Sequence, residues 1–145
     1  YEANTFPPWA WGKNDPPIIV NCYGKELEKS YIESALAFWE PYGHTHAFIV
    51  EEPMKEICDN KMLEGFILLK KAKGYHDENT LAYTTRKVAL FRIRAAVITF
   101  NPGAYRLDYV FEHELGHAFG YQHLEEDGHI MHPHFENMSE RFWIP

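Results

Sequence analysis

The chain has 145 residues, of which 46% are hydrophobic and 16% aromatic, so it is long and apolar enough to fold around a core of its own. Its formal net charge is −7, and no cationic run exceeds Lys70-Lys71, which argues against nucleic acid or an anionic membrane as the main partner. No stretch of 18 apolar residues is present, which excludes a membrane-spanning helix. We expect one domain over residues 1–145 and a monomer.

Residues 1–17 are rich in proline and predict an irregular arm laid over the body, with the rings of Trp9 and Trp11 as anchors. Apolar runs then favour strands at residues 18–23, 47–50, 65–69, 81–85, 89–93 and 96–100, the fourth and fifth of which could form a hairpin. Helical spacing favours helices at 25–39 and 107–120, with shorter helical turns near 54–61 and 138–143. This order predicts an α+β domain in which one helix carries the chemistry.

The two cysteines, Cys22 and Cys58, allow one disulfide. Two partly buried free thiols fit the sequence equally well, so the pairing stays open at this point.

The clearest motif is His113-Glu114-Leu115-Gly116-His117, which has the form H-E-x-x-H on a predicted helix. A spacing of four residues places both imidazoles on one side of the helix, where they can share an ion. Imidazole nitrogen is a good ligand for Zn²⁺. Glu114 follows the first ligand directly and is therefore placed to bond the water on the metal rather than the metal.

His123 supplies a third nitrogen, because Gly120 can adopt positive φ, end the helix and turn the chain back toward the ion. Three protein ligands leave a tetrahedral zinc one open position, which is typical of a catalytic site. Glu114 would take the proton of the water and later pass it to the leaving amine. A closed structural site, or a descendant that binds zinc without catalysis, is the alternative, and the presence of Glu114 argues against it.

The segment His113–His123 resembles the long zinc motif of the metzincin peptidases, and Met131 resembles the methionine of their downstream Met-turn. The spacing from His123 to Met131, followed by Pro133, is most similar to the matrixin branch. The resemblance implies a zincin-like fold: a twisted, mostly parallel sheet with an antiparallel edge strand, a backing helix and an active-site helix. It also implies an N-terminal subdomain over residues 1–123 and a short C-terminal subdomain over residues 124–145.

By the same resemblance, Met131 would lie beneath the metal, and extended substrates would pair with an edge strand. The substrate-binding residues that we expect on this basis are Leu81, Ala82, Tyr83, Pro133 and Phe135. One catalytic Zn²⁺ is expected as the cofactor. Tyr83 stands where matrixins carry a histidine for a second zinc, and the glycine- and aspartate-rich loops that hold structural calcium and zinc in that family are missing. Neither a second zinc nor structural calcium is therefore expected. The resemblance implies a secreted or extracellular protein, although no signal-peptide pattern stands at Tyr1.

The leading hypothesis is thus a zinc endopeptidase that acts on protein or peptide segments. A zinc hydrolase of small amides or cell-wall peptides, and a catalytically silent zinc-binding interaction module, are the alternatives. The remaining histidines are interpreted mainly as structural or incidental. His44 and His46 are expected in a loop and at a strand edge, and His76-Asp77 in an exposed polar turn rather than as a remnant of a metal-holding loop. His129, His132 and His134 are interpreted as polar surface, with a cleft rim that adjusts pH response or pocket polarity as the alternative.

Overall fold

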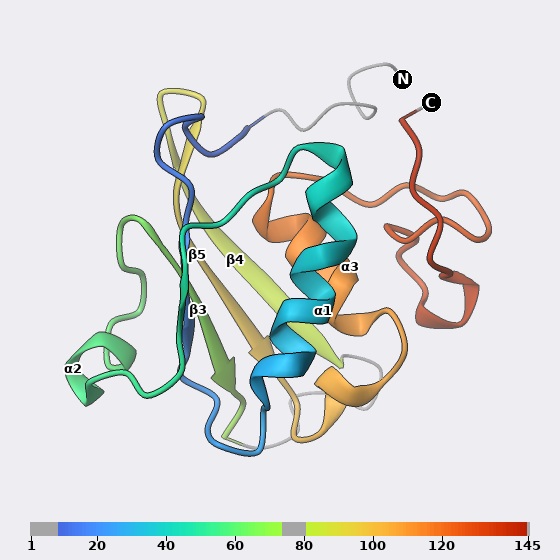
Figure 1. Ribbon diagram of the computed structural model, residues 1–145. Coiled ribbons are helices and arrows are strands. Elements are labelled where there is room, and N and C mark those ends of the chain that lie inside the picture. The colour runs from blue at the N-terminus through green and yellow to red at the C-terminus, as the bar shows by residue number, and fades with distance from the viewer. Residues whose placement is uncertain (1–8, 74–80, 145) are drawn as a thin grey trace.

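Five strands form a single twisted sheet in the computed structural model, which describes residues 9–73 and 81–144 (Figure 1). The strands are β1 (Ile18–Asn21), β2 (Ile49–Val50), β3 (Phe66–Lys71), β4 (Ala82–Ala89) and β5 (Arg92–Phe100). Their order is β2-β1-β3-β5-β4, and every neighbouring pair is parallel except β4 and β5. The expected mostly parallel sheet with an antiparallel edge strand is therefore confirmed.

Around the central strands the sheet has a buried core on each face, and successive side chains of a strand point alternately into the two cores. Ile19, Ile67 and Ile98 belong to the main core on one face. Their neighbours Val20, Leu68 and Val97 form a smaller core on the other face. This explains why the central residues of these strands, such as Ile67–Leu69 and Ala95–Ile98, are consecutive apolar residues rather than alternating ones.

Two helices, α1 (Lys29–Trp39) and α3 (Val110–Ala118), cover the face of the main core, side by side in front of the sheet in Figure 1. The apolar stripe of α1 is buried as its spacing predicts. At its end, fully buried Trp39 donates from Nε1 to the carbonyl of Glu112, 2.8 Å away on α3. This hydrogen bond from Trp39 joins α1 to α3, the helix that carries the H-E-x-x-H motif.

The smaller core on the opposite face is covered by the segment around α2 (Lys55–Cys58). Cys58 is bonded there to Cys22, which follows β1, with 5.5 Å between the two Cα atoms. Of the two alternatives that the sequence left open, the disulfide is the one found. The described residues also form the short 3-10 helices η2 (Glu40–Tyr42), η3 (Ala104–Arg106) and η4 (Phe135–Asn137).

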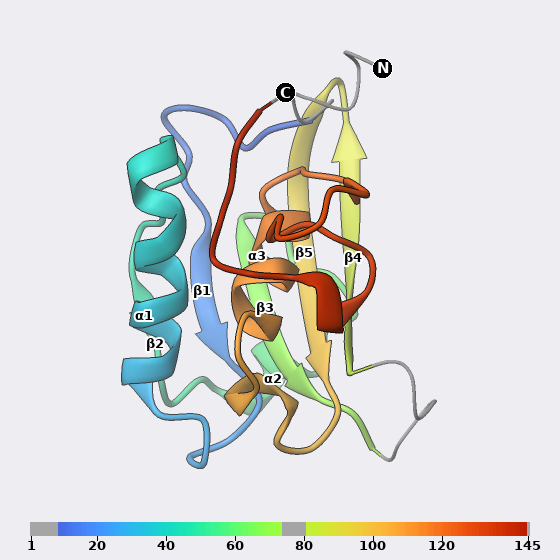
Figure 2. The same ribbon diagram turned by 90° about the vertical axis from the view of Figure 1, so that its right-hand side faces the viewer.

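Two expectations about elements were wrong. The predicted breaks in the region 81–100 are misplaced: β4 runs on to Ala89, only Leu90 and Phe91 form the turn, and β5 is continuous to Phe100. No helical turn forms at residues 138–143, where Arg141 instead makes a bridge with His129. In Figure 2 the C-terminal segment runs as extended chain across the front of the molecule.

The N-terminal arm is anchored as predicted. Trp11 donates from Nε1 to the carbonyl of Ala118 at 2.9 Å, and the ring of Trp9 lies under the guanidinium of Arg86, 4.8 Å from the Arg86 Cζ atom. The arm residues 1–8 and His76-Asp77 lie outside the described residues. Within residues 9–73 and 81–144, no helix is both long and apolar enough to cross a bilayer.

Candidate metal centre

The α3 helix places His113 and His117 one turn apart, on the side turned away from the main core. Their ring centroids lie 4.8 Å apart. Leu115 and Ala118 of the same helix face the core, so burial of the apolar stripe fixes the direction in which the two imidazoles point.

Gly120 ends the helix in a Schellman motif. Its φ is +114°, and the amides of Gly120 and Tyr121 donate to the carbonyls of His117 and Gly116 at 3.0 and 2.9 Å. A residue with a Cβ would be strained at this φ. The reversal brings His123 back over the helix, as the sequence predicted.

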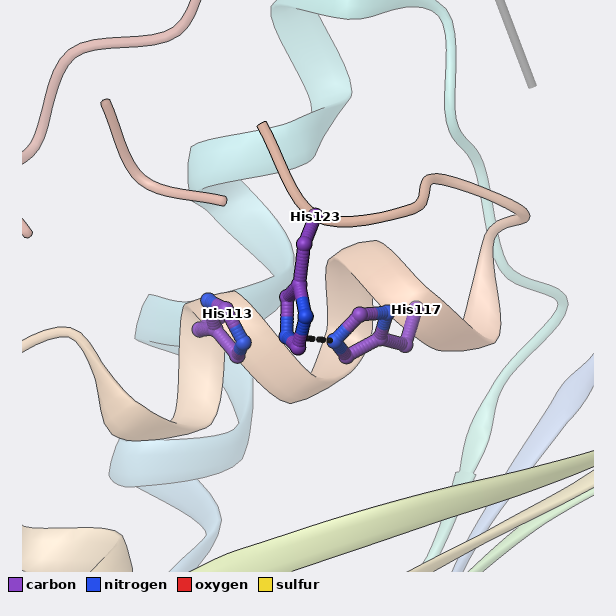
Figure 3. Close-up of side chains that lie close together, drawn as sticks. All are labelled: His113, His117 and His123. Atoms are coloured by element: carbon purple, nitrogen blue, oxygen red, sulfur yellow. Dashed lines mark hydrogen bonds between the residues drawn. The ribbon is translucent and has the colours of Figure 1, made fainter. Parts of the chain in front are cut away.

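The three imidazoles converge on one point (Figure 3). His113, His117 and His123 each place one ring nitrogen in a group of three atoms that lie within 4.8 Å of one another. The Nε2 atoms of His117 and His123 are 3.1 Å apart. In this view His123 hangs from the loop above α3, and its ring lies between those of His113 and His117.

Backbone carbonyls orient the two helix histidines. His113 Nδ1 lies 2.7 Å from the carbonyl oxygen of Ile130, and His117 Nδ1 lies 2.9 Å from that of Tyr121. Since a carbonyl oxygen only accepts, Nδ1 must carry the hydrogen in each ring. Nε2 is therefore the free lone pair of each neutral imidazole and faces the point of convergence.

Burial keeps these rings uncharged at neutral pH. Desolvation lowers the pKa of His113 to about 4 and that of His117 to about 3, and it lowers the pKa of His123 as well. All three imidazoles are therefore neutral, and backbone carbonyls hold the hydrogen at Nδ1 in His113 and His117. Such a set of nitrogen donors suits Zn²⁺. The residues present therefore fit the metal that the motif implies.

Glu114 is buried beside this group, at 6% exposure. Thr84 of β4 donates from its hydroxyl to Glu114 Oε1 at 2.7 Å and also lies 3.2 Å from the Glu114 carbonyl. Burial raises the pKa of Glu114 to about 7, and the hydrogen bond from Thr84 opposes that rise. Thr84 was not predicted from the sequence. The available signal was its position two residues after Ala82, since two such residues of a strand point to the same face and Ala82 was expected at the site.

Met131 packs against α3 at Gly116, with 1% of its surface exposed. A Cβ on Gly116 would collide with Met131 Sδ and come within 2.7 Å of Trp39 Cζ2. The preceding residue supplies the carbonyl that accepts from His113. The Met-turn segment therefore supports the helix from below, and only glycine at position 116 permits such a close approach.

A cavity of about 270 Å³ opens beside the histidines. It is lined by Leu81, Ala82, Val110, His113, Glu114, His123, His132, Pro133, Phe135 and Met138. Four of the five expected substrate-binding residues are in this lining. Tyr83 is not among the described residues that line it, because its side chain follows the opposite face of β4 and is 40% exposed.

The interpretation of His129 and His132 as polar surface was wrong: they are 2% and 6% exposed. His129 Nδ1 accepts from the amide of Met131 at 2.9 Å, so its Nε2 carries the hydrogen and donates to the Trp143 carbonyl at 2.9 Å. His132 Nδ1 accepts from the amide of His134 at 3.0 Å. Both rings hold the turn around Met131, and their nearness to that methionine was the only hint in the sequence.

A sequence model of the matrixin family matches residues 39–144, which include all three histidines, Glu114 and Met131. No curated protein matches the chain. Among solved structures, the chain is similar to high choriolytic enzyme 1, a hatching enzyme zinc-protease from the medaka fish Oryzias latipes, at 18% identity and a TM-score of 0.44. The similarity covers 79% of this chain and 49% of that one, so the chain spans about half the length of the structure it matches.

Proposed function

The chain belongs to the matrixin family of zinc metallopeptidases, and from that premise we propose that it is a zinc-dependent endopeptidase that hydrolyses peptide bonds in extended protein segments. The observation that carries the proposal is the convergence of three neutral imidazoles next to a buried carboxylate, at the mouth of a cavity. A structural zinc site has no use for Glu114 in that place.

His113, His117 and His123 would hold one Zn²⁺ ion through their converging ring nitrogens. When bound, zinc acidifies a coordinated water and polarises a carbonyl oxygen. Glu114 acts as the general base. Because Thr84 already donates to Oε1, we assign the proton transfer to Glu114 Oε2, which takes a proton from the attacking water and delivers it to the leaving nitrogen.

The substrate would be bound along β4, the antiparallel strand at one edge of the sheet. An extended peptide can add to such an edge through main-chain hydrogen bonds. Leu81, Ala82, Pro133 and Phe135 would then contact the side chain that enters the cavity, and we assign this cavity to the residue after the scissile bond. The Cys22–Cys58 disulfide supports an extracellular location, since disulfides persist in oxidising compartments.

Glu114→Ala tests this function. We expect the variant to retain stoichiometric zinc and to lose casein or gelatin turnover by at least about 100-fold, because general base catalysis contributes about that much or more. His123→Ala, in contrast, should weaken zinc binding. Equal activity in Glu114→Ala would refute the mechanism, and zinc binding without any turnover by the wild-type chain would favour the silent interaction module. Turnover of small amides alone would favour the other hydrolase.

A further inference from the structure

Arg86 is a half-buried cation that the proposed chemistry does not use. It lies on β4, two residues after Thr84, and its side chain therefore points to the same face of the strand, toward α3. Burial lowers the pKa of Arg86 from its usual value, but a guanidinium stays charged at neutral pH. A half-buried guanidinium needs hydrogen-bond acceptors, and for Arg86 these are backbone carbonyls of His117 and Tyr121.

The Nη1 atom of Arg86 donates to the carbonyl of His117 at 2.6 Å and lies 3.4 Å from the carbonyl of Tyr121. The first carbonyl belongs to the second histidine of the motif. The second is the acceptor that orients the imidazole of that same histidine, 2.9 Å from its Nδ1. One nitrogen atom therefore contacts both the backbone of His117 and the group that directs its ring.

The location at the end of α3 favours such a contact. The last carbonyls of a helix lack partners within the helix and carry its negative partial charge, so a cation is stabilised there. Trp11 already satisfies the carbonyl of Ala118. The ring of Trp9 lies against the guanidinium, which limits its movement.

We infer that Arg86 is a positioning residue for the metal centre. By fixing the His117 and Tyr121 carbonyls to the edge strand, it holds the end of α3 and the returning loop in one arrangement. The His117 ring then keeps its direction toward His123 before a metal arrives. This role rests on the proposed function, since it assumes that the three histidines bind zinc.

Lysine cannot replace this arrangement fully. An ammonium is a point charge on a flexible stem, whereas the planar guanidinium offers two hydrogens on Nη1 and a flat face for Trp9. Groups that orient a ligand histidine typically change metal affinity about 10- to 100-fold when they are removed. We expect Arg86→Met to lose zinc affinity in this range and Arg86→Lys to fall between it and the wild type.

The test measures the Zn²⁺ dissociation constant by competition with a chromophoric chelator, and the visible absorption of the Co²⁺ form, well below the thermal midpoint of each variant. Lys87→Met is the matched control, because Lys87 is the next residue of β4, is exposed and forms a surface ion pair with Glu64 at 3.2 Å. We expect it to bind zinc like the wild type. Arg86→Met should show both the weaker affinity and an altered Co²⁺ spectrum.

Unchanged zinc affinity in Arg86→Met, with only a lower thermal midpoint, would mean that Arg86 is merely structural and would overturn this inference alone. An equal loss in Lys87→Met would also overturn it, because the effect would then reflect net charge. A wild-type chain that bound no zinc, like a His113→Ala control, would instead overturn the proposed function.

Discussion

The ionisation of Glu114 depends on a balance between burial and one hydroxyl group. Burial favours the protonated acid, whereas the hydrogen bond from Thr84 favours the carboxylate. In the proposed mechanism Glu114 must be ionised before it can take a proton, so the Thr84 hydroxyl would support catalysis through Glu114.

Thr84→Val should therefore lower kcat/KM by roughly 10- to 100-fold, because a hydrogen bond to a charged group contributes about 1.5–3 kcal/mol. Zinc content should not change. Thr84→Ser, which restores the hydroxyl, should recover most of the activity. Thr85→Val is the control, since Thr85 is exposed on the opposite face of β4. Steady-state kinetics on a peptide substrate measure the effect, and equal losses at positions 84 and 85 would contradict it.

At the scale of elements, the metal centre depends on the contact of three segments at Gly116. The helix α3, the end of α1 at Trp39 and the turn at Met131 meet where no Cβ fits. We expect Gly116→Ala to reduce the free energy of unfolding by roughly 1–3 kcal/mol, because the buried Trp39 ring has no space into which it can move.

Alanine raises intrinsic helix propensity by about 1 kcal/mol over glycine, so a loss of stability would isolate the steric effect. Gly12→Ala is the matched control, because its nearest contact would be an ordinary 3.4 Å to Asp15 Oδ2. Urea denaturation of the zinc-free proteins measures both variants. A Gly116→Ala protein as stable as the wild type would show that Met131 does not lie so close to the helix.

The hairpin between β4 and β5 is strained at its turn. Leu90 and Phe91 have φ of +53° and +62°, yet they are 84% and 83% exposed and gain little from burial. A two-residue turn of this kind favours Asn-Gly. We expect Leu90→Asn combined with Phe91→Gly to raise the free energy of unfolding by about 1 kcal/mol, measured by urea denaturation.

Phe91→Ala is the control for the hairpin, because it removes the exposed ring and keeps a Cβ at positive φ. It should leave stability nearly unchanged. A gain as large as that of the double variant would show that exposure, rather than backbone strain, is the cost at this turn.

This same turn shows where sequence patterns stop being informative. Leu-Phe gives no turn signal, so the region 81–100 was divided wrongly although its strands were found. The helices were recognised because their apolar spacing is set by burial, which the sequence records directly. Element boundaries depend on caps and turns that involve few residues. The convergence of His113, His117 and His123 was predictable because their spacing matches that of a known zinc motif.

At the scale of the whole molecule, the sequence predicted the layers but not the contacts between distant segments. Thr84 and Arg86 contact α3 only because β4 is the edge strand beside it. His129 is buried because the C-terminal segment folds back over it, where the carbonyl of Trp143 accepts the hydrogen on His129 Nε2. Such partners are separated by many residues, and no local pattern encodes them. The disulfide is a further case, since spacing alone left its existence open.

Buried neutral histidines make the stability of the zinc-free chain depend on pH. His44 packs on Phe119 with ring centroids 5.0 Å apart, and its Nε2 lies 2.7 Å from the hydroxyl of Tyr121. Burial lowers the pKa of His44 to about 4, while the unfolded chain titrates near 6.5. Between these values the unfolded state binds more protons, so the free energy of unfolding should fall as pH drops from about 6.5 to about 4.

His113 and His117 have lowered pKa values for the same reason, burial, and should add to this loss in the absence of metal. His44→Gln, which keeps a polar group near Tyr121 but cannot titrate, should reduce the pH dependence by up to about 1 kcal/mol per pH unit after allowance for the exposed part of the ring. Urea denaturation at pH 7.5, 6 and 5 in the presence of a chelator measures it. Identical slopes for the wild type and His44→Gln would mean that His44 keeps an ordinary pKa in the folded chain, and that other buried histidines cause the acid sensitivity.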